Sequence, residues 1–90
     1  MDKTIPEISI DEIIDALNSK SLVLYNDDVN DFLWVIACLT EICNHSTVQA
    51  EQCAHIVHYK GRCNVKSGSY DDLAIMHREL SNKNLTVEIQ

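Results

Sequence analysis

Glycine and proline are scarce in this sequence, with two glycines and one proline among 90 residues. Disordered chains are poor in hydrophobic residues and rich in proline and glycine, whereas hydrophobic residues make up 46% of this chain. A chain of this length can bury one modest core. The composition therefore predicts a single ordered domain and excludes a linker or a low-complexity segment.

Long apolar runs and a secretory signal are also lacking. No stretch approaches the roughly 18 consecutive apolar residues that a transmembrane helix needs. The first residues, MDKTIPEISIDE, contain neither the basic region nor the apolar region of a signal peptide. We therefore expect a cytoplasmic protein with no membrane partner.

The motifs of common enzymes are missing as well. With Gly61 and Gly68 as the two glycines, the chain has no glycine-rich phosphate loop and no G-x-S-x-G motif, and it lacks H-E-x-x-H. Asp27, Asp28 and His58 could act as acid and base groups, but no obvious nucleophile accompanies them. We therefore expect that the protein is not an enzyme and needs no cofactor.

The cysteines match no common metal or redox motif. They are Cys38, Cys43, Cys53 and Cys63, and they form no C-x-x-C pair. Disulfides are rare in a reducing cytosol, so we expect small, partly buried hydrophobic side chains. His55 and His58 could supply two zinc ligands at i and i+3, but with these cysteines the spacing fits no known zinc site, and no metal is predicted.

Positive charge is absent from the middle of the chain. The net charge is −7, and no Lys or Arg occurs between Ser21 and Tyr59. The acidic residues of this stretch are Asp27, Asp28, Asp31, Glu41 and Glu51. Such a region would repel a phosphate backbone, so we expect no nucleic-acid partner, and it would attract a cationic ligand.

Hydrophobic periodicity predicts an α+β domain with the element order β-α-α-β-α-β. The expected elements are a strand at 22–25, a helix at about 31–43, a helix capped by Ser46 that ends at Lys60, a strand at 63–66, a helix opened by Ser69 and broken at 82–84, and a strand at 85–89. Residues 21–90 form the predicted core domain. Residues 1–20 form an N-terminal arm, either flexible or with a short helix after Ser9.

The segment YNDDVNDF, residues 25–32, combines three aspartates and two asparagines between a strand and a helix. Asn and Asp favour turns because their side chains bond to nearby backbone groups, and negative charge at a helix start contributes about 0.3–1 kcal/mol. From spacing alone, an ordinary turn is therefore the favoured interpretation. The alternative is a site that binds a cation, because like charges this close repel one another.

The segment LVLYNDDVNDFLWV, followed by His58 in AHIVHYKGRC, resembles the ClpS family of adaptors for the AAA+ Clp protease. The match extends without a gap from Leu22 to Gly61 and continues through SGSYDDL and the strand at 85–89. The resemblance implies a three-stranded antiparallel sheet covered by helices. It also implies binding of N-degrons, which are proteins with a free α-amino group and a bulky hydrophobic first residue.

The resemblance assigns roles to two groups of residues. Asn26, Asp27, Asp28 and His58 match the family positions around the substrate α-amino group. The positions that match the side-chain pocket are Asn30, Phe32, Val35, Ala54, Val57 and Leu85. These assignments make physical sense, because an ammonium group has three hydrogen-bond donors and no acceptor and therefore needs converging acceptors.

The resemblance also implies partners. We expect delivery of substrates to the N-terminal domain of ClpA or of a ClpC-like unfoldase, with Asp71 near the contact, and we expect the free chain to be a monomer. Ala54 stands where many members carry Met or Ile. We therefore expect peptides that begin with Phe, Leu, Tyr or Trp to bind, and we expect Ile or Val to be tolerated better than by an Ala54→Met variant. The alternative is a non-catalytic interaction domain of the same fold with a different ligand.

Overall fold

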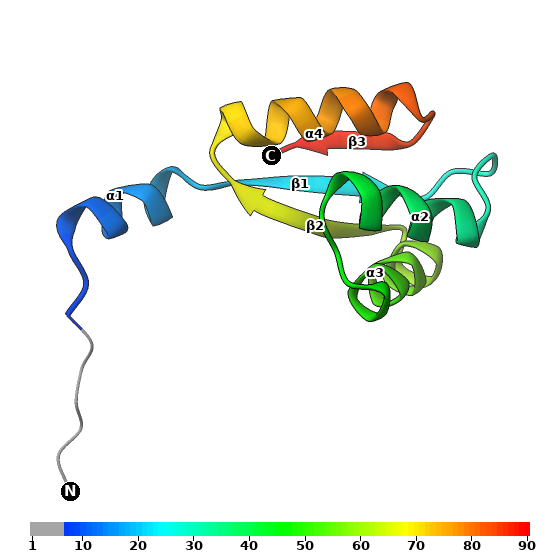
Figure 1. Ribbon diagram of the computed structural model, residues 1–90, viewed down its shortest axis with the longest axis horizontal. Coiled ribbons are helices and arrows are strands. Elements are labelled where there is room, and N and C mark those ends of the chain that lie inside the picture. The colour runs from blue at the N-terminus through cyan, green and yellow to red at the C-terminus, as the bar shows by residue number, and fades with distance from the viewer. Residues whose placement is uncertain (1–6) are drawn as a thin grey trace, which may run out of the picture.

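The computed structural model describes residues 7–90 and confirms the predicted α+β class and element order (Figure 1). The elements are α1 (Ile10–Asn18), β1 (Lys20–Tyr25), α2 (Phe32–Ile42), α3 (Thr47–Lys60), β2 (Arg62–Gly68), α4 (Tyr70–Asn82) and β3 (Thr86–Ile89). The first six residues of the predicted arm lie outside the described residues.

The three strands form one antiparallel sheet in the order β2-β1-β3. Lys20, at the start of β1, lies opposite Gly68 at the end of β2. Tyr25, at the end of β1, lies opposite both Arg62 of β2 and Thr86 of β3. The C-terminal end of the central strand therefore meets the starts of both neighbours.

Helices α2, α3 and α4 cover the sheet and complete the core. α3 packs on β2, α4 packs on β3 and β1, and α2 packs against α3 and α4. Alternate residues of each strand face these helices, as the pleat of a strand requires. The strand residues in the core or packed against it are Leu22, Leu24, Cys63, Val65, Val87 and Ile89.

Helix boundaries follow local capping signals. Asp31 accepts a hydrogen bond from the Trp34 backbone nitrogen at 2.8 Å and so caps α2. Ser46 accepts from the Gln49 nitrogen at 3.1 Å and caps α3, as predicted. Gly61 ends α3 with φ of +90°, a left-handed conformation that favours glycine. Each side-chain cap contributes about 1 kcal/mol.

All four cysteines are free thiols. Cys38, Cys43 and Cys53 are buried. Burial raises the pKa of Cys43 to about 11, and burial, with the neighbouring Cys53 side chain, raises the pKa of Cys63 to about 12. These thiols therefore stay protonated at neutral pH and pack as small hydrophobic groups.

Helix α1 extends away from the rest of the fold (Figure 1). Its N-cap, Ser9, accepts from the Glu12 backbone nitrogen at 3.1 Å, which is the predicted capping contact. No residue of this helix is buried, and Ile10, Ile13 and Leu17 are exposed to solvent. A helix of this length with no buried residue has little intrinsic stability in water.

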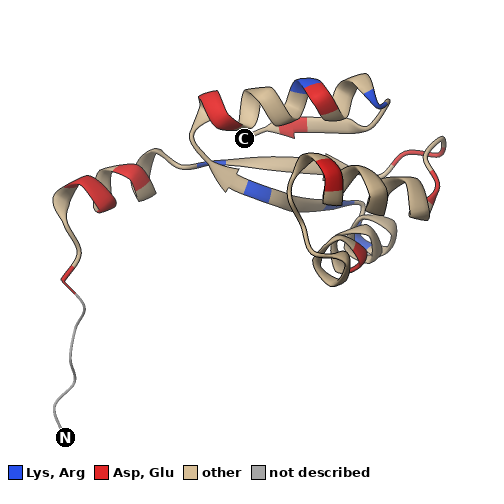
Figure 2. Ribbon diagram, in the orientation of Figure 1, with Lys and Arg blue, Asp and Glu red and all other residues tan. Residues whose placement is uncertain are grey.

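Acidic residues gather on α1 and on the loop between β1 and α2 (Figure 2). The loop carries Asp27, Asp28 and Asp31, and no basic residue lies between Ser21 and Tyr59. The negative charge of this loop therefore lies at the end of the sheet where β1 ends and β2 and β3 begin. Within residues 7–90, no helix is long and apolar enough to cross a membrane.

Candidate functional site

A small recess lies at the C-terminal end of β1, between the start of α2 and the end of α3. Its volume is about 50 Å³. The lining residues are Asn26, Asn30, Phe32, Val35, Ala54, Val57 and His58. A second hollow of about 20 Å³ shares Asn26, Asn30, Val35 and Val57 with it and is also lined by Asp27 and Leu85. The two hollows form one recess with a polar side and an apolar floor.

The recess exists because the end of β1 is tied to the end of α3. The backbone nitrogen of Asn26 donates to the Gly61 carbonyl at 2.9 Å. His58 lies in the last turn of α3, so this bond brings Asn26 and His58 to the same side of the recess. The left-handed backbone of Gly61 makes the tight connection between α3 and β2 possible.

The floor of the recess consists of core side chains. Ala54 and Val57 are 4% and 5% exposed on α3, and Leu85 is 5% exposed just before β3. Val35 of α2 packs against the core from the other side. Because these groups are apolar and close-packed, the floor suits one hydrophobic side chain rather than a polar ligand.

Asp27 orders the loop that borders the recess. Its Oδ1 accepts hydrogen bonds from the backbone nitrogens of Val29 and Asn30, at 3.0 and 2.8 Å. Its Oδ2 accepts from Asn30 Nδ2 at 2.8 Å and from Thr86 Oγ1 at 3.5 Å. Both carboxylate oxygens are thus engaged by the protein, which matches the turn interpretation of this motif.

The hydrogen bonds of Asp27 also keep it ionised. Burial pushes the pKa of Asp27 upward, but the bonds from Asn30, Val29 and Thr86 outweigh it and lower the pKa below the ordinary value. Asp27 therefore carries a full negative charge at neutral pH beside the recess. It contributes a field that favours a cation and positions Asn30.

Asn30 links the loop to the opposite wall. Its Nδ2 donates to Asp27 Oδ2 and to the Asn84 carbonyl, each at 2.8 Å. Trp34 adds a second link, since its Nε1 donates to the Lys83 carbonyl at 3.2 Å. Both amide hydrogens of Asn30 are therefore used. Its side-chain oxygen has no donor within residues 7–90 and remains an acceptor at the recess.

The structure brings together every residue expected at the site except Asp28. Asp28 is exposed and lines neither hollow, although it lies on the same acidic loop. His58 is exposed at the mouth of the recess and stands edge-on to Tyr59, with ring centroids 5.0 Å apart. Asn26, Asn30 and His58 line the larger of the two hollows, and each is a polar group that can accept a hydrogen bond from a ligand.

A row of aromatic rings beside the mouth was not expected from the sequence. The rings of Phe32 and His55 have centroids 4.7 Å apart, and His55 stacks on Tyr59 at 6.2 Å. His55 was considered as a zinc ligand, but within residues 7–90 no three His, Cys, Asp or Glu side chains are placed to hold a metal. The i, i+4 spacing of His55 and Tyr59 was the available signal.

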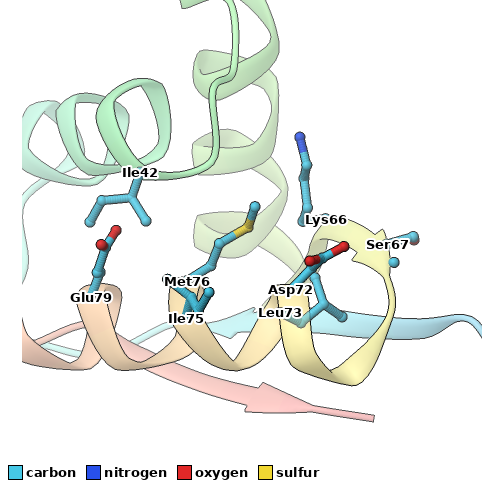
Figure 3. Close-up of a pocket in the computed structure, with 9 residues that line it drawn as sticks. Ile42, Lys66, Ser67, Asp72, Leu73, Ile75, Met76 and Glu79 are labelled. Atoms are coloured by element: carbon cyan, nitrogen blue, oxygen red, sulfur yellow. The ribbon is translucent and has the colours of Figure 1, made fainter.

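A larger groove lies at the other end of β1. It has a volume of about 320 Å³ and runs between the end of α2, the end of β2 and α4 (Figure 3). Ile42, Leu73 and Met76 form its apolar part, and Asp72 and Glu79 stand on its edges. Lys66 also lines it, and its Nζ donates to the Cys43 carbonyl at 3.1 Å. The lining therefore carries two carboxylates and one ammonium group.

Comparison with known proteins identifies the family. The family model "ATP-dependent Clp protease adaptor protein ClpS" matches residues 18–88. The fold is similar to that of Agrobacterium tumefaciens ClpS2, solved bound to L-phenylalaninamide, with a TM-score of 0.75 and 18% sequence identity over 81% of this chain and 95% of that chain. No curated protein sequence matches significantly. The chain therefore belongs to the ClpS family of Clp protease adaptors.

Proposed function

We propose that this member of the ClpS family binds the free α-amino group and hydrophobic first side chain of a substrate and delivers the substrate to a Clp unfoldase. One observation carries the proposal. The recess at the end of β1 combines polar acceptors on Asn26, Asn30 and His58 with an apolar floor, beside an acidic loop. A protein N-terminus has the same two parts, a cation and an adjacent side chain.

The chemistry of an ammonium group fits the polar side of the recess. The amide oxygens of Asn26 and Asn30 and a neutral His58 ring nitrogen can each accept one of its three hydrogens. The ionised Asp27 stabilises the positive charge from behind these acceptors. Hydrogen bonds to charged groups contribute about 1.5–3 kcal/mol each. An acetylated N-terminus has lost the charge and most of the donors.

The ligand of the related structure supports this proposal. Agrobacterium tumefaciens ClpS2 is bound to L-phenylalaninamide, a single residue with a free α-amino group and a hydrophobic side chain. The family membership supports the delivery step, since ClpS proteins are adaptors that are not themselves catalytic. We therefore propose an adaptor of the cytoplasm with no enzymatic activity of its own.

The groove between α2 and α4 is the proposed contact for the unfoldase. It lies at the start of β1, whereas the recess lies at its end, so both can be occupied at once. Its edge carries Asp72 and Glu79, and Asp71 is exposed beside it. We propose that basic residues on the N-terminal domain of ClpA, or of a ClpC-like unfoldase, meet this acidic edge.

Fluorescence-anisotropy titration with a peptide that begins with leucine tests the binding step. We expect the free peptide to bind and its N-acetylated twin to bind about tenfold to 150-fold more weakly, the equivalent of one lost charged hydrogen bond. Equal affinities for the two peptides would favour an interaction domain of the same fold with a different ligand.

A further inference from the structure

Helix α1 has an apolar face, although no residue of the helix is buried. Its large hydrophobic residues are Ile10, Ile13, Ile14 and Leu17. They recur at i, i+3, i+4 and i+7 and so lie on one face, with Glu12 on the opposite face. Their exposed fractions range from 46% to 78%. Because most helices in proteins are stabilised by packing of their apolar face, α1 requires a surface that covers this one.

The groove between α2 and α4 offers an apolar surface of the right length. Ile42 and Met76 line it from the two helices (Figure 3). A further hollow of about 270 Å³ shares Ile42 and Glu79 with the groove and continues to Asn82. The two hollows therefore follow α4 from Asp72 to Asn82, a rise of about 15 Å, and the nine residues of α1 span about 13 Å.

A short hinge joins α1 to the sheet. The helix ends at Asn18 and β1 begins at Lys20, so Ser19 alone separates the two elements. The strand is fixed immediately afterwards, because Ser21 and Gln90 exchange two backbone hydrogen bonds of 2.8 Å. A few residues at the end of an element can absorb the backbone rotation of a hinge. α1 can therefore change direction at Ser19 without disturbing the sheet.

An open cleft of about 490 Å³ separates α1 from the groove. Its walls are the end of α1 and the start of α4, and two of its residues, Gly68 and Asp72, also line the groove. Each wall carries a carboxylate, Asp15 on α1 and Asp72 on α4. Repulsion between these like charges opposes closure and favours the open arrangement that the structure shows.

Rotation at the hinge would lay α1 antiparallel to α4. The hinge lies beside the start of α4, so the start of α1 would reach toward the end of α4. The positive N-terminal end of one helix then lies near the negative C-terminal end of the other, which is a favourable arrangement of helix dipoles. With the apolar face turned into the groove, Glu12 points to solvent and away from Glu79.

We propose that α1 is an intramolecular strap, which closes over the groove between α2 and α4 and competes with the unfoldase for it. In the closed arrangement, the apolar face of α1 packs on Ile42, Leu73 and Met76. Closure itself is independent of the proposed function. The competition rests on that function, because it takes the groove as the contact for the unfoldase.

NMR spectroscopy of the full chain tests closure. We expect nuclear Overhauser contacts between the methyl groups of Leu17 and Met76 in the wild type. Ile13→Gln/Leu17→Gln removes the apolar face while keeping a good helix former at both positions, and it should shift the amide signals of residues 72–79. Glu12→Gln is the matched control, because it places the same residue on the opposite face of α1. It should leave those signals unchanged.

Titration with purified ClpA tests the competition. If about two thirds of the chains are closed, the apparent Kd for the unfoldase is about threefold higher than that of the open form. Ile13→Gln/Leu17→Gln should therefore bind ClpA about threefold more tightly than wild type, and Glu12→Gln should bind as wild type does. Affinity for a peptide with a free amino group should be equal in all three proteins, because α1 does not line the recess.

The results separate the strap from the proposed function. Identical signals of residues 72–79 in wild type and Ile13→Gln/Leu17→Gln would overturn closure. Contacts that weaken on dilution would place α1 in the groove of a second copy and would equally overturn it. Closure with an unchanged affinity for ClpA would overturn the competition. Failure of the proposed function would appear elsewhere, as equal binding of free and acetylated peptides, and would leave the NMR evidence for closure intact.

Discussion

The recess and the groove, which lie at opposite ends of β1, differ in size and in internal order. The recess at the end of the strand consists of hollows of about 50 and 20 Å³, and the loop beside it is held by side-chain hydrogen bonds of Asp27 and Asn30. The groove at the start of the strand is about 320 Å³, with an apolar floor and acidic edges. A small ordered site suits one chemical group, whereas an open groove suits a protein surface. The fold thus separates selection of a ligand from docking of a partner.

The largest expected effect comes from removing the residue that orders the recess. Asp27→Ala should abolish peptide binding and lower the free energy of unfolding by about 1–3 kcal/mol, because the donors of Val29, Asn30 and Thr86 lose their acceptor. Urea denaturation and peptide titration measure the two effects. Asp28→Ala, on the same loop but outside the recess, is the control and should leave stability almost unchanged.

A smaller effect, confined to binding, is expected at the mouth of the recess. His58→Ala should weaken binding of a free-amino peptide by about tenfold to 150-fold, the loss of one charged hydrogen bond. Stability should not change, since the His58 side chain is exposed. His58→Gln retains an acceptor and should recover part of the affinity. Wild-type affinity in His58→Ala would remove this residue from the site.

The groove should respond to charge without any effect on the recess. Reversal of Asp72 and Glu79 to lysine should slow Clp-dependent degradation of a delivered substrate roughly threefold to tenfold, because edge charges mainly affect association. Peptide affinity should stay the same, since neither residue lines the recess. The control is Glu12→Lys, which reverses the charge of one residue on α1, away from the groove. A reduced rate in that control would indicate a general charge effect.

The smallest expected effect is the dependence of stability on acid. The lowered pKa of Asp27 means that its ionised form stabilises the folded state above the ordinary aspartate pKa of about 3.9. This stabilisation is lost as the pH falls through the lower folded pKa. Melting temperatures of wild type and Asp27→Asn should therefore converge in acid, below about pH 4. A difference in melting temperature between the two proteins that stays constant down to pH 2.5 would contradict this account.

Most of the fold could be predicted from local signals. The helix caps Ser46, Ser69 and Gly61 lie where the sequence indicated, because capping depends on residues three or four positions away. β2 extends to Gly68, beyond the predicted 63–66, because pairing with Lys20 at the start of β1 sets its length. Pairing of this kind depends on residues distant in sequence.

The site was less predictable than the fold. The residues around the amino group came from the family resemblance, and spacing alone favoured a turn for Asp27, a role that its hydrogen bonds show directly. The contact between Phe32 and His55 joins two helices, so no local pattern could indicate it. Helix formation after Ser9 was one of two alternatives, because the capping spacing favoured a helix while Pro6, the acidic composition and the terminal position favoured a flexible arm; the structure has the helix.

An NMR titration with L-leucinamide and N-acetyl-L-leucinamide tests the central claim most directly, because it reports on the recess and on the groove in one experiment. L-Leucinamide should shift the backbone amide signals of residues 26–35 and 54–58 and leave those of 72–79 unchanged. The acetylated compound at the same concentration should cause little or no shift. Equal shifts from both compounds, or shifts confined to the groove between α2 and α4, would contradict a recess that binds a free α-amino group and its side chain.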